Sequence, residues 1–142
     1  MEILIKKSEL LNALSKVQGI VEKKNTVPSN DFRLFFANTR GEVCEGTGTN
    51  VFVVLDGAIR TPPLSSGCLA GITRELVLEN LDVIEQPMPL SVLQDANEVF
   101  LTSSTRDVQA LECIDDRALD VGPLTRDAVA ALASVMATDL DP

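Results

Sequence analysis

Hydrophobic and polar positions divide this chain into a short amphipathic start and a longer remainder rich in strand patterns. Ile3 and Ile5 alternate with polar neighbours, which predicts a half-buried strand over residues 1–7. Ser8 is a suitable N-cap for a helix that follows and ends before Pro28. The apolar stripe of that helix recurs at helical spacing and consists of Leu10, Leu11, Leu14, Val17 and Val21. The start of the chain is therefore predicted to be a strand–helix unit.

The remainder predicts strands first, then strands mixed with helices. Residues 50–55 and 58–61 flank Asp56-Gly57, a two-residue signal for a tight hairpin because glycine tolerates the positive φ of a type I′ turn. Other strands are predicted over residues 32–37, 83–85, 98–102 and 106–114. Helices are predicted over residues 73–80, 90–96 and 125–137. The pattern indicates one domain that contains both kinds of element.

Charge changes along the chain at the same place as the hydrophobic pattern. The chain has 142 residues, 45% of them apolar, and a net charge of −9, which argues against a general nucleic-acid binder. Residues 1–24 hold all five lysines and have a net charge of +2, whereas residues 25–142 hold seven arginines, no lysine and a net charge of −11. We therefore divide the chain into segments 1–28 and 29–142.

Cysteine usage and the lack of targeting signals indicate a cytoplasmic protein. Cys44, Cys68 and Cys113 are far apart and the chain has no histidine, so a zinc site is not expected and metal ligands are predicted to be absent. No apolar run is long enough for a membrane span, and the first residues do not read as a signal peptide. Reduced cysteines, at least two of them in the core, are expected.

Three motifs in the second segment have both a functional and a structural interpretation. Residues 44–50 (CEGTGTN) either form a tight connection between strands or approach a ligand with the Glu45 carboxylate. Residues 69–74 (LAGITR) run from a glycine into a helix, whose N-terminus either binds nothing or holds a phosphate. Residues 102–107 (TSSTRD) form either a hydroxyl-rich turn or further anion donors. Spacing alone does not separate these alternatives.

In their order and spacing the three motifs resemble the C-terminal domain of class IV aminotransferases, which depend on pyridoxal phosphate. That family includes branched-chain aminotransferases, D-amino-acid aminotransferases and 4-amino-4-deoxychorismate lyases. The resemblance covers residues 33–142, and TPPLSSGCLAGITRE and LTSSTRDVQ are closest to the first and third groups. It implies an α/β domain with a mixed, strongly twisted, barrel-like sheet and peripheral helices.

The resemblance also implies a role for five residues in holding pyridoxal phosphate. The family's motif glutamate, which is Glu45 here, pairs with the pyridine nitrogen and keeps the ring protonated. The backbone N–H groups of Ile72 and Thr73 hold the phosphate, and the hydroxyls of Ser104 and Thr105 complete the phosphate site.

The catalytic lysine of the family has no counterpart in the second segment. It forms a Schiff base with the cofactor and lies upstream of the motif glutamate, yet residues 25–142 contain no lysine. Lys7 and Lys16 bracket the expected separation but lack the family's neighbouring residues. We therefore expect no catalytic residue and, at most, weak cofactor binding without transamination.

Substrate and partners follow from the same resemblance. Arg106 lies beside the phosphate motif and is predicted either to bind a substrate carboxylate or to form a surface salt bridge. The substrate would be an amino acid or an aminodeoxychorismate-like molecule, and a homodimer is expected because the intact enzymes are homodimeric.

Residues 1–28 have a different resemblance. The string MEILIKKSELLNALSKVQGIVEKKNTVP is similar to the N-terminus of a bacterial DNA polymerase sliding clamp, the β subunit. Three hypotheses follow for the whole chain: a truncated or chimeric member of the class IV family, a fragment related to the replication clamp, or an artificial fusion without evolved function.

Overall fold

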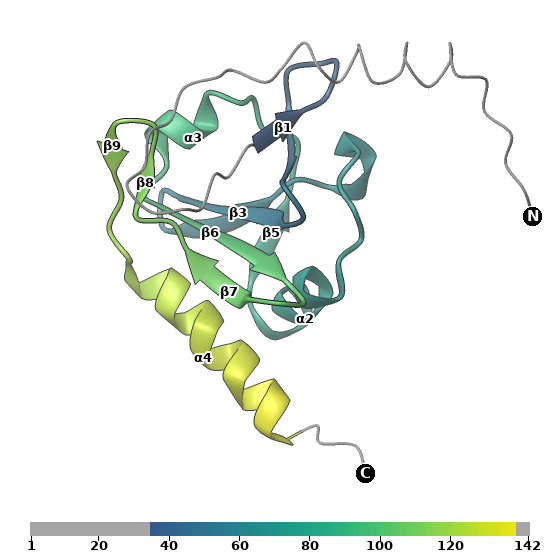
Figure 1. Cartoon of the computed structure of the whole chain (residues 1–142), viewed down its shortest axis with the longest axis vertical. Helices are drawn as coiled ribbons and strands as arrows, with labels where there is room; N and C mark the ends of the chain where they lie inside the picture. Colours follow the sequence, from purple (N-terminus) through teal and green to yellow (C-terminus); the bar gives the residue numbers. More distant parts are fainter. Residues whose placement is uncertain (1–34, 139–142) are drawn as a thin grey trace, which may run out of the picture.

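A computed structural model describes residues 35–138, which are coloured in Figure 1. The strands are β1 (Phe35–Ala37), β2 (Val43–Gly46), β3 (Asn50–Leu55), β4 (Ala58–Thr61), β5 (Val83–Glu85), β6 (Glu98–Ser103), β7 (Asp107–Ala110), β8 (Cys113–Ile114) and β9 (Arg117–Ala118). The helices are the short 3-10 helix η1 (Leu64–Ser66), α2 (Ile72–Asn80), α3 (Val92–Asp95) and α4 (Pro123–Thr138). The strand–helix unit predicted for segment 1–28 lies outside the described residues.

A five-stranded mixed sheet in the order β5-β4-β3-β6-β7 forms the centre of the fold. The predicted hairpin of β3 and β4 is confirmed, with φ values of 52° at Asp56 and 73° at Gly57 in its turn. Strand β4 pairs with β5 in parallel, so the chain crosses over between them, and α2 is that connection. The other pairs in this sheet are antiparallel. The predicted α/β class with a mixed sheet is confirmed.

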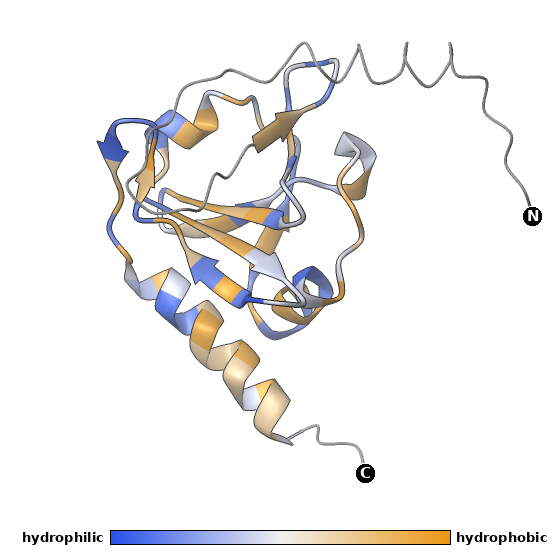
Figure 2. Ribbon diagram, viewed as in Figure 1, coloured by the Kyte–Doolittle hydropathy of each residue, from blue (hydrophilic) through white to orange (hydrophobic). Residues whose placement is uncertain are grey.

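Both faces of the central strands β3 and β6 are buried, which explains their continuous apolar runs. In Figure 1, α2 and α4 lie below the sheet and α3 lies above it. The residues of the lower cluster are Phe52, Val54, Ile59, Val77, Phe100 and Ala128. The upper cluster includes Val43, Val51, Val53, Met88, Leu93, Val99 and Leu101. In Figure 2 the central strands are mostly orange, whereas β7 and β9 carry hydrophilic segments.

The prediction of one strand over residues 106–114 is wrong. Strand β7 ends at Ala110, and β8 then pairs with β9 instead of with the central sheet. Asp115 has a φ of 52°, which starts a tight turn at Asp115-Asp116 and folds the chain into a second hairpin. A run of apolar and polar residues does not by itself show that the strand changes its partner.

The helices within the described residues differ slightly in length and position from those predicted. None of the helices within residues 35–138 has the length and apolar character needed to cross a membrane. Helices α2 and α4 confirm the two longer helix predictions. Helix α2 begins one residue, and α4 two residues, earlier than the pattern indicated. Helix α3 is shorter than predicted and covers only Val92–Asp95.

Candidate functional site

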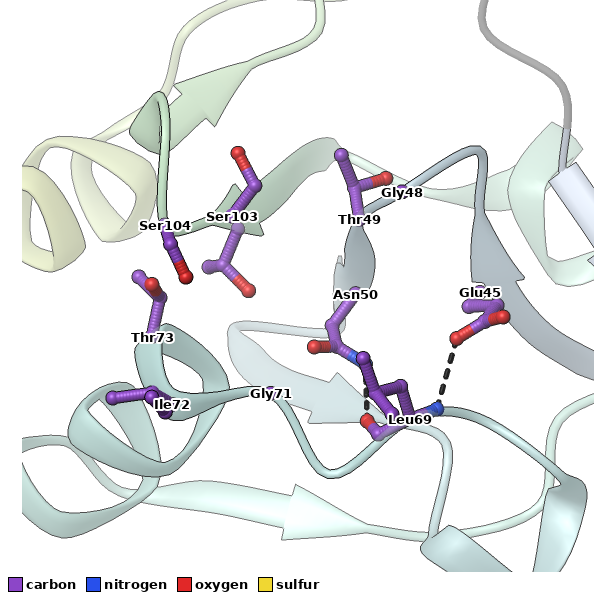
Figure 3. A pocket seen from close by; sticks show the side chains of 11 residues that line it. Glu45, Gly48, Thr49, Asn50, Leu69, Gly71, Ile72, Thr73, Ser103 and Ser104 are labelled. Atoms are coloured by element: carbon purple, nitrogen blue, oxygen red, sulfur yellow. Dashed lines mark hydrogen bonds between the residues drawn. The ribbon is translucent and has the colours of Figure 1, made fainter. Parts of the chain in front are cut away.

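A pocket of about 160 Å³ opens where four connections of the fold meet, and Figure 3 shows it from close by. They are the end of β2 with its turn into β3, the link before α2, the first turn of α2, and the end of β6. The lining residues are Glu45, Gly48, Thr49, Asn50, Leu69, Gly71, Ile72, Thr73, Thr102, Ser103 and Ser104. All three motifs singled out in the sequence therefore contribute to one pocket.

At one end of the pocket Glu45 presents a half-buried carboxylate from β2. Its Oε2 atom accepts a hydrogen bond of 2.9 Å from the backbone N–H of Leu69. Gly46 and Thr49 exchange two backbone hydrogen bonds around Gly48, whose φ is 65°, so the CEGTGTN motif is a tight strand connection as well as a pocket wall. The structural and functional interpretations of this motif are thus compatible.

At the opposite end of the pocket in Figure 3 lie Thr73, Ser103 and Ser104. Helix α2 begins after Gly71, and within the described chain no side chain caps its first N–H groups. The N–H groups of Ile72 and Thr73 are therefore the first donors of a helix whose dipole favours an anion. Uncapped N–H groups beside serine and threonine hydroxyls suit a phosphate.

Two hydroxyls in the pocket lack a hydrogen-bond partner among the described residues. They are Oγ1 of Thr49 and Oγ1 of Thr102, and both oxygen atoms are shielded from solvent. The Thr102 side chain is 1% exposed at the end of β6. A buried polar group without a partner costs about 1–3 kcal/mol, so a ligand oxygen or nitrogen that satisfies it would bind favourably. Both atoms fit a polar ligand in this pocket.

The pocket contains four of the residues that the resemblance implied, and it omits two. Glu45, Ile72, Thr73 and Ser104 line it, whereas Thr105 and Arg106 do not. Thr105 and Arg106 are exposed in the β6–β7 turn, where Ser103 Oγ lies 3.4 Å from Thr105 Oγ1.

Sequence reasoning assigned no role to several residues that the pocket brings together. These are Thr49, Asn50, Leu69, Gly71, Thr102 and Ser103. Each lies within one of the three motifs noted in the sequence, so the motif boundaries indicated which segments line the pocket. Which hydroxyls of those motifs face the pocket is decided by strand register and turn geometry.

Cys44 and Cys68 stand directly before the two pocket residues Glu45 and Leu69, and both are buried. Cys44 Sγ donates a hydrogen bond of 2.7 Å to the carbonyl of Ser66. Burial is the main cause that raises the pKa of Cys44 and that of Cys68 above the ordinary thiol value. The contribution of these protonated thiols to the free energy of unfolding is therefore complete below about pH 8.5. It is lost as the pH rises through their raised pKa values.

We expect Cys113, which is only partly buried, to be alkylated by iodoacetamide at pH 8 about tenfold faster than Cys44 or Cys68. The reason is that buried thiols with a raised pKa are rarely ionised or reached by the reagent. Peptide mass mapping over time measures the three rates. In guanidinium chloride the three rates should converge, and equal rates in the folded chain would contradict this account.

Residues 29–112 match the model of the family described as amino-transferase class IV. The chain belongs to this family. The match spans all three pocket motifs and the whole central sheet, so the class IV membership rests on the part of the chain that builds the site. The expected family is thereby confirmed, while the clamp resemblance of segment 1–28 stays a prediction.

Individual relatives show how much of their length this chain represents. A Methanocaldococcus jannaschii protein, provisionally named a branched-chain-amino-acid aminotransferase, is 36% identical over 100 residues, 65% of this chain and 35% of that protein. A branched-chain aminotransferase structure from Thermoproteus uzoniensis with norvaline aligns with a TM-score of 0.72 and 26% identity, covering 94% of this chain and 45% of that one.

A third similar structure contains a cofactor. The structure of a Brucella abortus aminotransferase bound to PLP aligns with a TM-score of 0.65 and 30% identity, covering 68% of this chain and 36% of that one. In all three comparisons the chain spans less than half the length of the relative.

Proposed function

We propose that residues 35–138 bind pyridoxal phosphate across the pocket, with the ring nitrogen toward Glu45 and the phosphate toward the start of α2. One observation carries this proposal: a carboxylate stands at one end of the pocket, and uncapped helix N–H groups with hydroxyls stand at the other. The partnerless hydroxyls of Thr49 and Thr102 support the fit, because the cofactor carries a phenolic oxygen and a phosphate that such hydroxyls can contact.

Each residue has a physical task in this proposal. The Glu45 carboxylate accepts a hydrogen bond from the protonated ring nitrogen and stabilises its positive charge. Ile72 and Thr73 donate backbone N–H groups to the phosphate, and Ser104 adds a hydroxyl. When bound, the cofactor supplies an electron-withdrawing ring. Thr105 and Arg106 are exposed in the β6–β7 turn and are not part of the pocket lining, so their contacts to phosphate and substrate stay predictions.

We further propose that this chain binds the cofactor without transaminating an amino acid by itself. All five lysines lie in residues 1–24, outside the part that matches the family. An amino-acid or aminodeoxychorismate-like substrate, a homodimer and a cytoplasmic location stay predictions. Leu69 and Ile72 favour self-association, since these large apolar side chains at the pocket rim are 71% and 74% exposed.

Binding is tested with pyridoxamine phosphate, which has no aldehyde and therefore cannot react with the lysines. We expect the Glu45→Gln variant to bind it about tenfold more weakly, because a hydrogen bond between charged groups is lost. Inorganic phosphate should bind the variant and the unaltered chain equally. Isothermal titration calorimetry measures both ligands.

Glu79→Gln is the matched control, since it makes the same chemical change on the exposed side of α2. It should leave both affinities unchanged. If the unaltered chain binds neither ligand, the proposed function is wrong. Adding pyridoxal phosphate and then borohydride tests the lack of transamination, and a stoichiometric adduct on one lysine, seen by mass, would overturn that part.

A further inference from the structure

We propose that Asn50 is a positioning residue that fixes the Glu45 carboxylate through the backbone of Leu69, and this inference rests on the proposed function. Asn50 begins β3, opposite Thr102 of β6, and its side chain is 6% exposed. Its position is therefore set by the pairing of β3 with β6 in the central sheet.

The Asn50 carboxamide is held between two backbone segments of the link before α2. Its Nδ2 atom donates a hydrogen bond of 2.7 Å to the carbonyl of Leu69. Its Oδ1 atom occupies the space beside Gly71, where an added Cβ would stand 2.2 Å from it. Residue 71 must therefore be glycine for Asn50 to reach Leu69 while α2 keeps its place. The contact ties the link to β3.

Leu69 passes this constraint on to Glu45. Its N–H donates the 2.9 Å hydrogen bond to Glu45 Oε2, and its carbonyl accepts the hydrogen bond from Asn50. The two groups are attached to the same Cα atom. The Leu69 side chain is 71% exposed, so side-chain packing does not hold this residue. Figure 3 shows the two hydrogen bonds meeting at Leu69. Hydrogen bonds to its backbone, one of them from the buried Asn50 side chain, therefore hold the link in place.

This arrangement gives Asn50 a distinct effect on binding. A carboxylate held by a fixed N–H loses little rotamer freedom when it meets a ring nitrogen, so Asn50 lowers the entropic cost of that contact. The phosphate end depends on the start of α2 instead. Loss of Asn50 should therefore weaken the contact with the ring nitrogen more than the contact with the phosphate.

The first test needs no cofactor. In the Asn50→Asp variant, which keeps the side-chain size but loses the N–H donor, we expect the Leu69 amide proton to exchange about tenfold faster, measured by NMR. The amides of Val53 and Val99 in the sheet core should be unchanged. Asn80→Ala is the control, because Asn80 Nδ2 makes a similar bond of 2.8 Å to Leu76 within α2. An unaltered Leu69 exchange rate in Asn50→Asp overturns the proposal.

The second test separates positioning from general damage to the pocket. The probes are pyridoxamine phosphate, its analogue with a carbon–hydrogen unit in place of the ring nitrogen, and inorganic phosphate. We expect Asn50→Ala, which removes the carboxamide without adding a charge to the pocket, to weaken only the first, by about threefold to tenfold, and to have no further effect in a Glu45→Gln background.

Equal losses for all three probes would show that Asn50 supports the fold or the phosphate end, which overturns the positioning role. If the unaltered chain binds none of the probes, the proposed function fails, and the exchange measurement still decides whether Asn50 fixes Leu69. The two failures are thus distinguishable.

Discussion

Replacing Phe100 with alanine is expected to lower the free energy of unfolding by about 3–5 kcal/mol, the largest effect anticipated for a single side chain here. Phe100 of β6 lies directly opposite Phe52 of β3, and both side chains are fully buried. Their rings stack with centroids 4.8 Å apart and an interplanar angle of 5°. Val77 of α2 and Ala128 of α4 belong to the same cluster, so truncation leaves a cavity between the sheet and both helices.

Urea unfolding followed by circular dichroism measures this loss in Phe100→Ala, Phe52→Ala and the double variant. The double-mutant cycle should give a coupling of about 0.5–1.5 kcal/mol for the ring pair. Val129→Ala serves as the control because Val129 is 46% exposed on α4, and it should change the stability by less than about 0.5 kcal/mol. A loss below about 1 kcal/mol in Phe100→Ala would be inconsistent with a shared core on this face.

Replacing Glu98 with alanine is expected to cost about 2–3 kcal/mol, because its buried carboxylate caps a helix that is distant in the sequence. Glu98 is 6% exposed at the start of β6. Its Oε2 atom accepts a hydrogen bond of 2.7 Å from the N–H of Thr125, and Oε1 accepts one of 3.4 Å from Leu124. An added Cβ on Gly122 would lie 2.1 Å from Oε1, so the helix approaches the strand closely at this point.

Thermal unfolding of Glu98→Ala, Glu98→Gln and the exposed-site control Glu112→Ala tests this cap. Glu98→Gln keeps an acceptor oxygen but loses the charge, so its loss should fall between those of the other two variants. Amide exchange in the first turn of α4 should accelerate in Glu98→Ala before the rest of the domain opens. If Glu98→Ala unfolds at the same temperature as Glu112→Ala, the Glu98 carboxylate does not anchor the helix.

Local sequence chemistry predicted much of the fold because the signals act over a few residues. Asp56-Gly57 predicted the β3–β4 turn, since both positions need a positive φ and these residue types tolerate it. The apolar run of β3 and the helical spacing of α2 gave their element types. The prediction failed at residues 106–114, where the end of the strand depends on which neighbour pairs with it.

The sequence by itself determined the family, the order of the three motifs and the residues Glu45, Ile72, Thr73 and Ser104 of the pocket. Those motifs are short and their chemistry is local, so they can be recognised without the fold.

Only the tertiary structure decided which partners these residues have. The bonds Glu45–Leu69, Asn50–Leu69 and Glu98–Thr125 join residues 24, 19 and 27 positions apart. Such contacts depend on strand order and register, and a shift of one residue in β3 or β6 would turn their side chains to the opposite face. Register therefore places Thr102 and Asn50 in the pocket, whereas the turn between β6 and β7 leaves Thr105 outside its lining.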